Sequence, residues 1–373
     1  MAVKKKHQRP KIAVVLGTRP EIIKMSPVIR YLERFKKDYF IVHTGQHYSF
    51  EMDRLFFKEL ELPEPKHQLS VHLAPSQGHG EHLGRMLSHL EKIFLDEKPS
   101  VIAVQGDTNT VLAGALVASK IHGIQVAHVE AGLRSYDREM PEEINRILTD
   151  HISDYLFPPT QLAKKILLSE GISAKKIHVT GNTIVDAVVQ NMKIAEKKGL
   201  PMPYGLKTNE PFFLMTMHRQ ENVDFKDRLK AILIGLSRVH EHFKIPIIFP
   251  MHPRTEKMLK TFGLTLPAGV RHVAPAGFLD FLRLEGKAKL ILSDSGGVQE
   301  EACILKVPCV TLRTTTERPE TLTTGGNVLA GYDPVKILSG AKKMISKKAV
   351  WKNPFGDGRS GERIVQILEN QAT

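Results

Sequence analysis

Residues 12–36, IAVVLGTRPEIIKMSPVIRYLERFK, contain the pattern that decides the fold. The five apolar residues Ile12–Leu16 have the length and composition of a buried parallel strand. Gly17 then allows a tight turn, and Pro20 suits the first turn of a helix. From there to residue 36 the apolar side chains recur at helical spacing, at Ile22, Met25, Ile29, Leu32 and Phe35. A strand, a turn and an amphipathic helix form the first half of a β-α-β unit.

The same unit repeats along the chain. Further strands are expected at Phe40–His43, Val101–Gln105, Gln125–Val129, Tyr155–Phe157 and Ile177–Thr180, with helices such as His82–Phe94 and Thr110–Ile121 between them. Residues 197–211, KKGLPMPYGLKTNEP, interrupt the periodicity. It then restarts with expected strands at Phe213–Met217, Ile247–Phe249, Val270–Val273, Leu290–Leu292 and Cys309–Leu312. We therefore predict an α/β protein with two doubly wound domains, residues 1–180 and 181–355, each with a parallel sheet covered on both faces.

Composition narrows the class of protein. Apolar residues make up 42% of the 373 residues and charged residues 25%, as in soluble globular proteins. No run of eighteen apolar residues occurs, and no apolar signal core follows the basic segment 1–11, so a cytoplasmic protein without a membrane span is expected. The two cysteines, Cys303 and Cys309, lie in apolar surroundings and predict buried thiols rather than a disulfide framework or a metal site.

The formal net charge is +13, which suits an anionic partner. The lysines are spread along predicted helices, 226–244 and 336–348, and aromatic residues are not interleaved with them. Solvated helix faces that attract an anionic substrate are therefore expected rather than a nucleic-acid surface.

Polar residues follow the expected strands, where a doubly wound sheet binds its ligands. Arg19 and Lys24 stand near a helix N-terminus, which favours an anion, although surface cations at an ordinary connection are the alternative. Asp107, in the segment GDTNT, could act as an acid or a base, but by itself a helix cap is the simpler interpretation.

Two further acids follow strands of the same sheet. Glu130 directly continues an apolar strand, so it either pairs with Arg134 or faces a cleft, and the cleft is favoured. Glu142 suits the first turn of a helix, where acids are common. Because Asp107, Glu130 and Glu142 all come after strands of one sheet, we expect that they can converge.

The strongest local signal in the second half is residues 293–302, SDSGGVQEEA, which follow the expected strand Leu290–Leu292. Ser295, Gly296 and Gly297 would present backbone N–H groups at a helix start, which suits a diphosphate. Glu301 lies one turn further, where it could accept the two hydroxyls of a ribose, and Arg318 follows the next strand.

His218, in the segment HRQEN, could serve as an acid, a base or a phosphate ligand. No Gly-Lys-Ser/Thr loop occurs after the glycines, and no G-x-G-x-x-G follows the first strand, so neither a Walker site nor a dinucleotide site is indicated.

Ten blocks of sequence in this order resemble the non-hydrolysing UDP-N-acetylglucosamine 2-epimerase family. They run from about residue 11 to the C-terminal NPFGDGRSGERIV and read GTRPEIIKMSPVI, TGQHY, GDTNT, VEAGLR, PEEINR, GNTIVDA, HRQEN, HPRT, SDSGGVQEEA and TTERPE. The resemblance implies two Rossmann-like domains in the glycosyltransferase-B architecture, with the active site in the cleft between them. It also implies that residues 356–373, with a helix at 358–372, cross back onto the first domain.

The resemblance further implies a reaction and its residues. UDP-GlcNAc would become UDP-ManNAc by elimination of UDP to 2-acetamidoglucal and re-addition, without a cofactor and in a homodimer. Asp107, Glu130, Glu142 and His218 match catalytic positions of the family. The substrate-binding positions match Arg19, Lys24, Arg146, Phe281, Ser295, Gly296, Gly297, Glu301 and Arg318, with Phe281 beside the uracil. Gln46 and His47 match positions that bind a second UDP-GlcNAc as activator, whereas no regulatory arginine is evident in residues 69–82.

Several alternatives stay open from the sequence. One is a 2-epimerase acting on UDP-2,3-diacetamido-2,3-dideoxyglucuronic acid, a related branch of the family. Another is a glycosyltransferase of the same architecture, which the three acids disfavour. A nucleic-acid binder is motivated only by the charge, and a hydrolysing epimerase is disfavoured by the GTRPE and HRQEN blocks.

Overall fold

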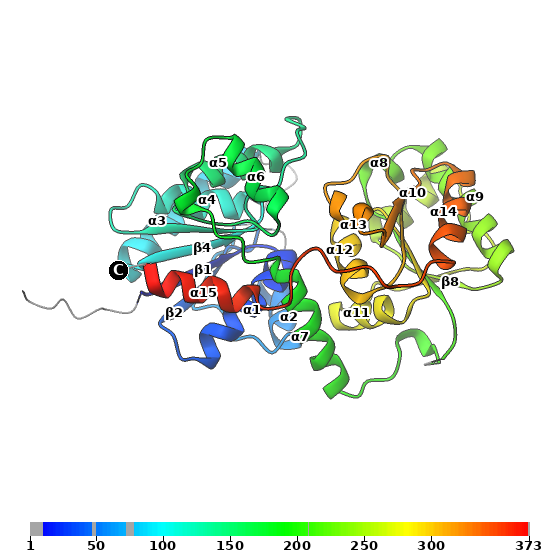
Figure 1. The fold of residues 1–373 in the computed structure, drawn as a ribbon, viewed down its shortest axis with the longest axis horizontal. Helices are drawn as coiled ribbons and strands as arrows, with labels where there is room; N and C mark the ends of the chain where they lie inside the picture. Colours follow the sequence, from blue (N-terminus) through cyan, green and yellow to red (C-terminus); the bar gives the residue numbers. More distant parts are fainter. Residues whose placement is uncertain (1–9, 47–49, 72–77, 208, 372–373) are drawn as a thin grey trace, which may run out of the picture. The chain divides into compact units, whose positions relative to one another are not determined.

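Two parallel β-sheets are built from the apolar runs, one in each half of the chain (Figure 1). The computed structural model describes residues 10–46, 50–71, 78–207 and 209–371. The chain divides into unit 1, which comprises residues 1–190 and 355–373, and unit 2, which comprises residues 191–354. The sequence prediction put this boundary at residue 180, whereas the division falls after Gln190, inside a helix.

Unit 1 contains a six-stranded sheet, within the described residues, in the order β3-β2-β1-β4-β5-β6. Its strands are β1 (Ile12–Leu16), β2 (Tyr39–His43), β3 (His67–Gln68), β4 (Val101–Gln105), β5 (Gln125–Val129) and β6 (Tyr155–Phe157). Its helices are α1 (Arg19–Arg34), α2 (Phe50–Glu59), α3 (His79–Glu97), α4 (Asn109–Ala118), α5 (Pro141–Ile152), α6 (Gln161–Ser169), α15 (Ser360–Gln371) and the first part of α7 (Thr183–Lys197), with a 3-10 turn at Ala174–Lys176.

Unit 2 contains a second sheet of six strands, counted over the same described ranges, in the order β12-β11-β10-β7-β8-β9. Its strands are β7 (Phe213–Thr216), β8 (Ile247–Pro250), β9 (Val270–Val273), β10 (Leu290–Ser293), β11 (Cys309–Thr311) and β12 (Asn327–Leu329). Its helices are α8 (Gln220–Val223), α9 (Lys226–Phe243), α10 (Pro253–Phe262), α11 (Phe278–Lys287), α12 (Gly296–Leu305), α13 (Pro319–Thr323) and α14 (Pro334–Ile345), with a 3-10 turn at Pro203–Gly205.

Both sheets have the same doubly wound topology. In each, the third, second, first, fourth, fifth and sixth strands of that unit are neighbours, and all the strand pairs are parallel. The direction of winding therefore reverses between β1 and β4, and again between β7 and β10. Ligands of such sheets bind at the carboxyl ends of the strands at these switch points. The predicted α/β class with two Rossmann-like domains is confirmed.

Each sheet is covered on both faces, as the apolar runs predicted. In unit 2, Leu290 and Leu292 of β10 belong to one core with α9 and α14, while Ile291 between them belongs to another core with α11 and α12. Successive strand residues point to opposite faces, so a strand that is buried on both sides must be apolar throughout. Cys309 is fully buried in the second of these cores, in agreement with a structural thiol.

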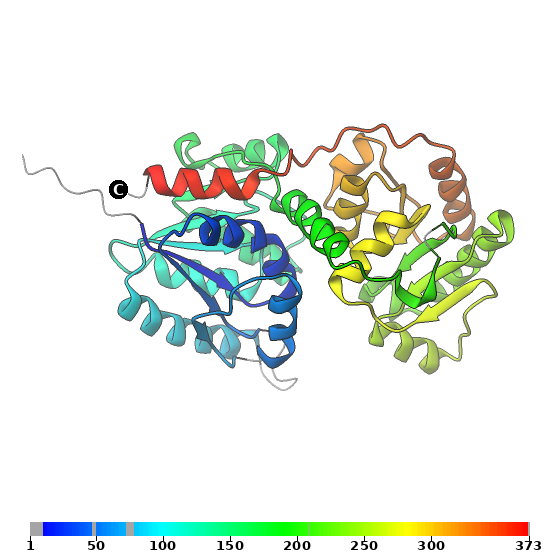
Figure 2. The same cartoon turned by 90° about the horizontal axis from the view of Figure 1, so that it is seen from below.

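The C-terminal helix α15 returns to unit 1 and packs against α1 (Figures 1 and 2). Its apolar face buries Ile364, Val365 and Leu368 almost completely. Its N-terminus is held by Asp186 of α7, whose carboxylate accepts the N–H groups of Ser360 at 3.1 Å and Gly361 at 3.0 Å. The apolar face of α15 is therefore part of the core of unit 1.

Three short segments differ from the sequence prediction. Ile177–Thr180 was expected as a strand, but only Ile177 bridges to Leu156 of β6, so that prediction is wrong. Conversely, β3 and β12 were not predicted. The strand β3 consists of two polar residues and β12 of only three residues, so neither forms a recognisable apolar pattern.

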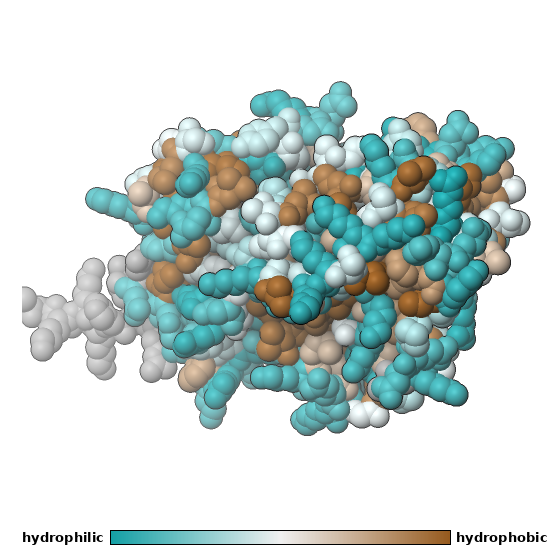
Figure 3. Space-filling view, turned by 45° about the vertical axis from the view of Figure 1, so that its right-hand side comes forward, coloured by the Kyte–Doolittle hydropathy of each residue, from teal (hydrophilic) through white to brown (hydrophobic). Residues whose placement is uncertain are grey.

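Among the described helices, none combines the length and the apolar character needed to cross a membrane. On the face drawn in Figure 3, hydrophilic residues are spread widely, with apolar residues in groups between them.

Candidate active site

Several of the residues that the sequence singled out lie at the switch points of the two sheets. In unit 1, Arg19 follows β1 and Asp107 follows β4, and these strands are neighbours. In unit 2, His218 follows β7 and Ser295 follows β10, which are also neighbours. Each unit therefore gathers its own cluster of polar groups at one sheet edge.

The turn after β1 is fixed by a buried carboxylate. Glu21 is 1% exposed and accepts the N–H groups of Gly17 at 2.6 Å and Thr18 at 3.2 Å, and the hydroxyl of Thr108 at 2.5 Å. Burial raises the pKa of Glu21 to about 7, although these hydrogen bonds act in the opposite direction. A Cβ on Gly17 would meet the hydroxyl of Thr110 at 2.1 Å, so glycine is required there. Glu21 thus joins the β1–α1 turn to the β4–α4 turn.

The cations of α1 already have acidic partners. Arg19 Nε lies 3.1 Å from Asp53 of α2, while its side chain stays 40% exposed. Lys24 Nζ donates to both oxygens of Glu130, at 2.8 and 2.5 Å. The alternative that these are merely surface cations is therefore wrong for Lys24, whose side chain is 13% exposed.

Glu130 is held in an unusual conformation at the end of β5. Its φ of 69° lies in the left-handed region, which is uncommon for a residue other than glycine. Besides Lys24, the amide of Gln105 donates to its Oε2 at 2.5 Å. The pairing with Arg134 that the sequence left open is not formed, because Arg134 lies beside Asp150 at 2.8 Å and Glu170 at 2.6 Å. Strained conformations of this kind persist where the surroundings impose them, often at functional sites.

Asp107 lies in a turn that is held by groups from several elements. Its carboxylate pairs with Arg146 of α5, and its carbonyl oxygen accepts the amide of Asn145 at 3.0 Å. The expectation that Asp107 caps the helix is wrong, because the N-cap of α4 is Thr108, whose hydroxyl oxygen accepts the N–H of Val111. The carboxylate of Asp107 is thereby left at the sheet edge, beside a cation.

A buried charge network underlies the same turn. His128 of β5 lies 2.7 Å from Asp150 through Nδ1 and 2.8 Å from the carbonyl oxygen of Gly106 through Nε2. Each ring nitrogen of His128 therefore has its own polar partner, one on α5 and one in the turn after β4. Burial acts to raise the pKa of Asp150, but His128 and Arg134 outweigh it and the pKa is lowered. The network fixes the backbone one residue before Asp107.

The sequence PEE contains two acids with different environments. Glu142, predicted as catalytic, is exposed, whereas Glu143 is 1% exposed. Glu143 accepts the N–H of Ser135 at 2.9 Å, that of Tyr136 at 3.0 Å, and Arg146 at 2.8 Å. Burial acts against ionisation of Glu143, but these partners outweigh it and its pKa is lowered. Glu142 therefore does not join the cluster of paired acids, while Glu143 supports the cation that holds Asp107.

Gln46 contacts the start of α4, directly after the turn that contains Asp107. Its Oε1 accepts two hydrogen bonds from Thr110, one from the N–H group at 2.9 Å and one from the hydroxyl group at 2.8 Å. His47, predicted with it as part of a second substrate site, lies outside the described residues.

In unit 2 the start of α12 is open to a ligand. Ser295 is the N-cap, and its own N–H donates to the hydroxyl of Ser293 at 2.9 Å. A Cβ on Gly296 or Gly297 would meet no protein atom closer than 3.9 Å, and neither residue has a positive φ. Protein packing therefore does not require these glycines, and their small size leaves room for a group to approach the helix N-terminus closely.

Glu301 lies one turn into α12 and is 8% exposed. Its neighbour is Glu285 of α11, whose pKa is raised well above 4.5 by complete burial and by the carboxyl of Glu301. Burial and the neighbouring acid therefore favour the protonated form of Glu285.

His218 stands on a turn that a buried aspartate organises. Asp294, which is fully buried, accepts the N–H groups of His218 at 3.1 Å and Arg219 at 3.0 Å, and the amide of Asn222 at 3.1 Å. Burial lowers the pKa of His218, although the charge of Asp294 acts to raise it. The imidazole is thus favoured in its neutral form near pH 7. Sequence reasoning passed over Asp294, although its position directly after a strand was the available signal.

Two predicted residues of unit 2 remain, Arg318 and Phe281. Arg318 lies 2.7 Å from Glu300 of α12. Phe281 of α11 is partly buried and packs against the core that contains Ile291 and Cys309.

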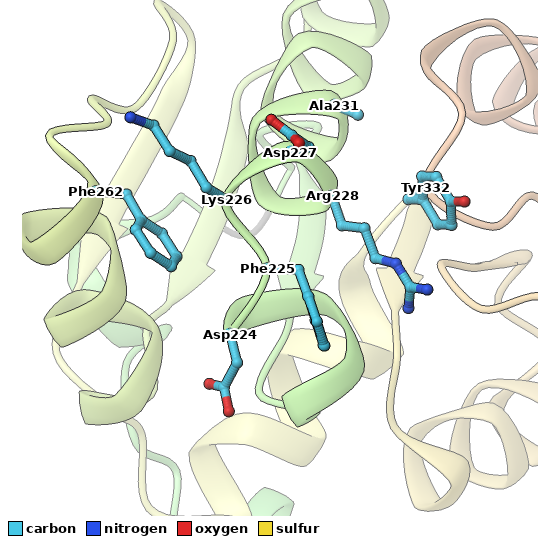
Figure 4. Close-up of a pocket in the computed structure, with 8 residues that line it drawn as sticks. All are labelled: Asp224, Phe225, Lys226, Asp227, Arg228, Ala231, Phe262 and Tyr332. Atoms are coloured by element: carbon cyan, nitrogen blue, oxygen red, sulfur yellow. The ribbon is translucent and has the colours of Figure 1, made fainter.

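Within the described residues, no group of three His, Cys, Asp or Glu side chains could hold a metal ion. A surface pocket of unit 2, shown in Figure 4, contains none of the predicted site residues. There the guanidinium of Arg228 lies 5.2 Å from the ring of Phe225 and 5.0 Å from that of Tyr332.

The fold and the two clusters define a two-domain α/β protein with polar groups at both switch points. Comparison with known proteins agrees. Residues 30–369 match the family model described as UDP-N-acetylglucosamine 2-epimerase. The chain therefore belongs to the UDP-N-acetylglucosamine 2-epimerase family, which confirms the resemblance and the prediction that it is an enzyme of this kind.

Individual relatives cover nearly the whole chain. The UDP-N-acetylglucosamine 2-epimerase of Methanocaldococcus jannaschii is 57% identical over 364 residues, which are 96% of this chain and 98% of the relative. A crystal structure of the UDP-GlcNAc 2-epimerase of that organism, in complex with UDP-GlcNAc and UDP, aligns with a TM-score of 0.85 over 96% of this chain and 99% of that one, at 57% identity. The UDP-2,3-diacetamido-2,3-dideoxy-D-glucuronate 2-epimerase of Pseudomonas aeruginosa is 40% identical over 360 residues, 96% of this chain and 99% of the relative.

Proposed function

We propose that this chain inverts C2 of UDP-GlcNAc to give UDP-ManNAc without hydrolysing it. The observation that carries the proposal is the pair of acids in unit 1, Asp107 and Glu130, each beside a cation at one sheet edge. The proposal is also supported by the N-terminus of α12 in unit 2, where Gly296 and Gly297 leave room for an anion to approach the backbone N–H groups. The M. jannaschii relative, which is 57% identical, is named UDP-N-acetylglucosamine 2-epimerase, in agreement with inversion at C2.

The chemistry is an elimination followed by an addition. One acidic group takes the proton from C2 while the bond from C1 to the diphosphate oxygen breaks, which leaves 2-acetamidoglucal and UDP. UDP then adds back to C1 while a proton arrives at C2 on the opposite face. Asp107 and Glu130 divide these two proton transfers, and Glu142, which is not paired with them in this structure, would support them once the substrate is bound.

UDP must be retained while it is free of the sugar. The open N–H groups at Gly296 and Gly297 hold the diphosphate, with Ser295 as the N-cap. The imidazole of His218, whose pKa is lowered by burial, donates to the diphosphate, and Glu301 accepts the ribose hydroxyls. The proposed substrate contacts also include Arg19, Lys24, Arg146, Phe281 and Arg318, and Gln46 with His47 would contact a second UDP-GlcNAc.

A second candidate substrate is the diacetamido uronate. The relative from P. aeruginosa supports it, since it shares 40% identity over almost the whole chain. The higher identity of 57% favours UDP-GlcNAc.

Proton NMR in deuterated buffer tests the proposal. The purified chain with UDP-GlcNAc and no added cofactor should give UDP-ManNAc, and deuterium should appear at C2 of both sugars. Parallel incubation with the uronate substrate separates the second candidate. The absence of both a new sugar and deuterium at C2 would refute the epimerase proposal.

A further inference from the structure

Tyr136 has an unusual position in the segment that joins β5 to α5. Its side chain is 75% exposed, although a large aromatic ring is usually at least half buried. Its φ of 58° lies in the left-handed region, which is a genuine exception for a bulky residue. The ring therefore contributes little to the core, and its backbone conformation is costly.

A buried carboxylate imposes this conformation. Glu143 accepts the N–H groups of Ser135 at 2.9 Å and Tyr136 at 3.0 Å, and also the hydroxyl of Ser135 at 2.8 Å. The segment then turns back, with the N–H of Met140 donating to the carbonyl oxygen of Asp137 at 3.2 Å. The exposed ring is thus presented on a rigid support rather than on a loose loop.

The carboxylate of Glu143 also connects the backbone of Tyr136 to a proposed catalytic acid through hydrogen bonds. Arg146 donates to Glu143 at 2.8 Å with one nitrogen and pairs with Asp107 through the other. The segment also begins directly after Glu130. Because it connects the carboxyl end of β5 to the next helix, it belongs to the sheet edge at which a ligand binds.

We propose that Tyr136 is a specificity-determining contact to the sugar of the nucleotide sugar. The inference rests on the proposed function and extends it to the hexopyranose ring. An aromatic ring that is fixed and exposed can cover the C–H face of a pyranose, excluding water from it, while its hydroxyl stays solvated. The cost of the left-handed backbone is then offset by a contact made only when the sugar is bound.

The test compares two glycine substitutions. Tyr136→Gly removes the ring and relieves the backbone, so the melting temperature should be unchanged or higher. The KM for UDP-GlcNAc and the dissociation constant of UDP-GlcNAc should rise about tenfold, while the dissociation constant of UDP stays within about twofold. Tyr136→Phe should restore the wild-type values.

Tyr204 is the matched control. It has the same side chain and a φ of 59°, but it lies in unit 2, where its hydroxyl donates to the carbonyl oxygen of Ala274 at 2.6 Å. Tyr204→Gly should leave both affinities unchanged.

Three results would overturn the inference. The first is an unchanged affinity of Tyr136→Gly for UDP-GlcNAc, and the second is an equal loss of affinity for UDP. The third is a loss of activity that accompanies a change in molecular mass by light scattering, which would assign Tyr136 to contact with a second copy in the expected homodimer. A wild-type chain that binds UDP-GlcNAc without exchanging the C2 proton contradicts the proposed function instead, and the affinity measurements still decide the role of Tyr136.

Discussion

Asp107 and Glu130 differ from Glu142 in what surrounds them. Asp107 pairs with Arg146, and Glu130 pairs with Lys24 and Gln105, so both carboxyl groups have a defined position. Glu142 is exposed at the start of α5. A group that transfers a proton must be held within hydrogen-bond reach of the reacting atom, which favours the two paired acids.

Substitution of these two acids should separate catalysis from folding. Asp107→Asn and Glu130→Gln each keep the size of the side chain but remove its ability to take a proton. We expect each to lower kcat by at least about a hundredfold, with little change in melting temperature. The measurement is the initial rate of UDP-ManNAc formation. Glu139→Gln, which changes an exposed acid between β5 and α5, should remain within about twofold of wild type. Activity of Asp107→Asn within tenfold of wild type would reassign Asp107 to a structural role.

At the scale of elements, one turn is held from several sides. The turn after β4 receives Glu21 from α1, Gln46 from the segment after β2, His128 from β5 and Asn145 from α5. Each contact satisfies a buried polar group, so losing one would leave its partner unsatisfied. This convergence explains why the position of Asp107 depends on elements that are far apart in the sequence.

Glu21 should make the stability of the protein depend on pH. Its pKa is raised from 4.5 to about 7, so the folded state binds this proton more tightly than the unfolded chain. The contribution is therefore present at low pH and is lost as the pH rises toward the folded pKa. Between pH 5 and pH 8, wild type should lose about 2.5 kcal/mol of unfolding free energy relative to Glu21→Gln. Calorimetric unfolding of both proteins at the two pH values measures this difference.

Glu97 provides a control, because its pKa is shifted in the opposite direction from that of Glu21. Hydrogen bonds from Lys11 and Lys66 lower its pKa to about 2. Its stabilising contribution is therefore complete above pH 4.5 and is lost only as the pH falls toward 2. Glu97→Gln should keep a constant difference from wild type between pH 5 and pH 8, and a constant difference for Glu21→Gln as well would contradict the raised pKa of Glu21.

At the scale of the whole molecule, helices that are far apart in the sequence, α1 and α15, pack together in unit 1. Helix α15 follows all of unit 2 in the sequence but buries Ile364, Val365 and Leu368 in unit 1. Burial of three such side chains contributes about 5 to 9 kcal/mol, which is comparable with the whole stability of a domain. Unit 1 therefore depends on residues at the far end of the chain.

Truncation after Pro354 should unfold unit 1 and leave unit 2 folded. Calorimetry should then lose the transition of unit 1, while the fluorescence of Trp351, the single tryptophan and a buried residue of unit 2, should keep its folded value. Asn370→Ala, an exposed position of α15, should leave both signals unchanged. A truncated protein with both transitions would show that unit 1 is complete without α15.

The fold could be predicted because its signals are local. The apolar runs of β1 and β10 and the glycine turns after them lie in contiguous sequence, and the winding of both sheets follows from their alternation with helices. The family followed from ten blocks in one order, each readable without knowledge of its neighbours in space. The prediction of a strand at Ile177–Thr180 was wrong, because a short run of residues with strand propensity forms a strand only where a partner strand lies beside it.

The side-chain partners of the site were decided by the tertiary structure. The sequence pointed to Glu142, yet its neighbour Glu143 is the buried one, since adjacent helix residues face different directions. Glu21 bonds to Thr108, 87 residues away, and Lys24 to Glu130. Residue type and spacing along the chain determined the strands, the helices, the turns and the family. Burial and pairing depend on segments that only folding brings together, so the structure alone decided which acids are held and by which cations.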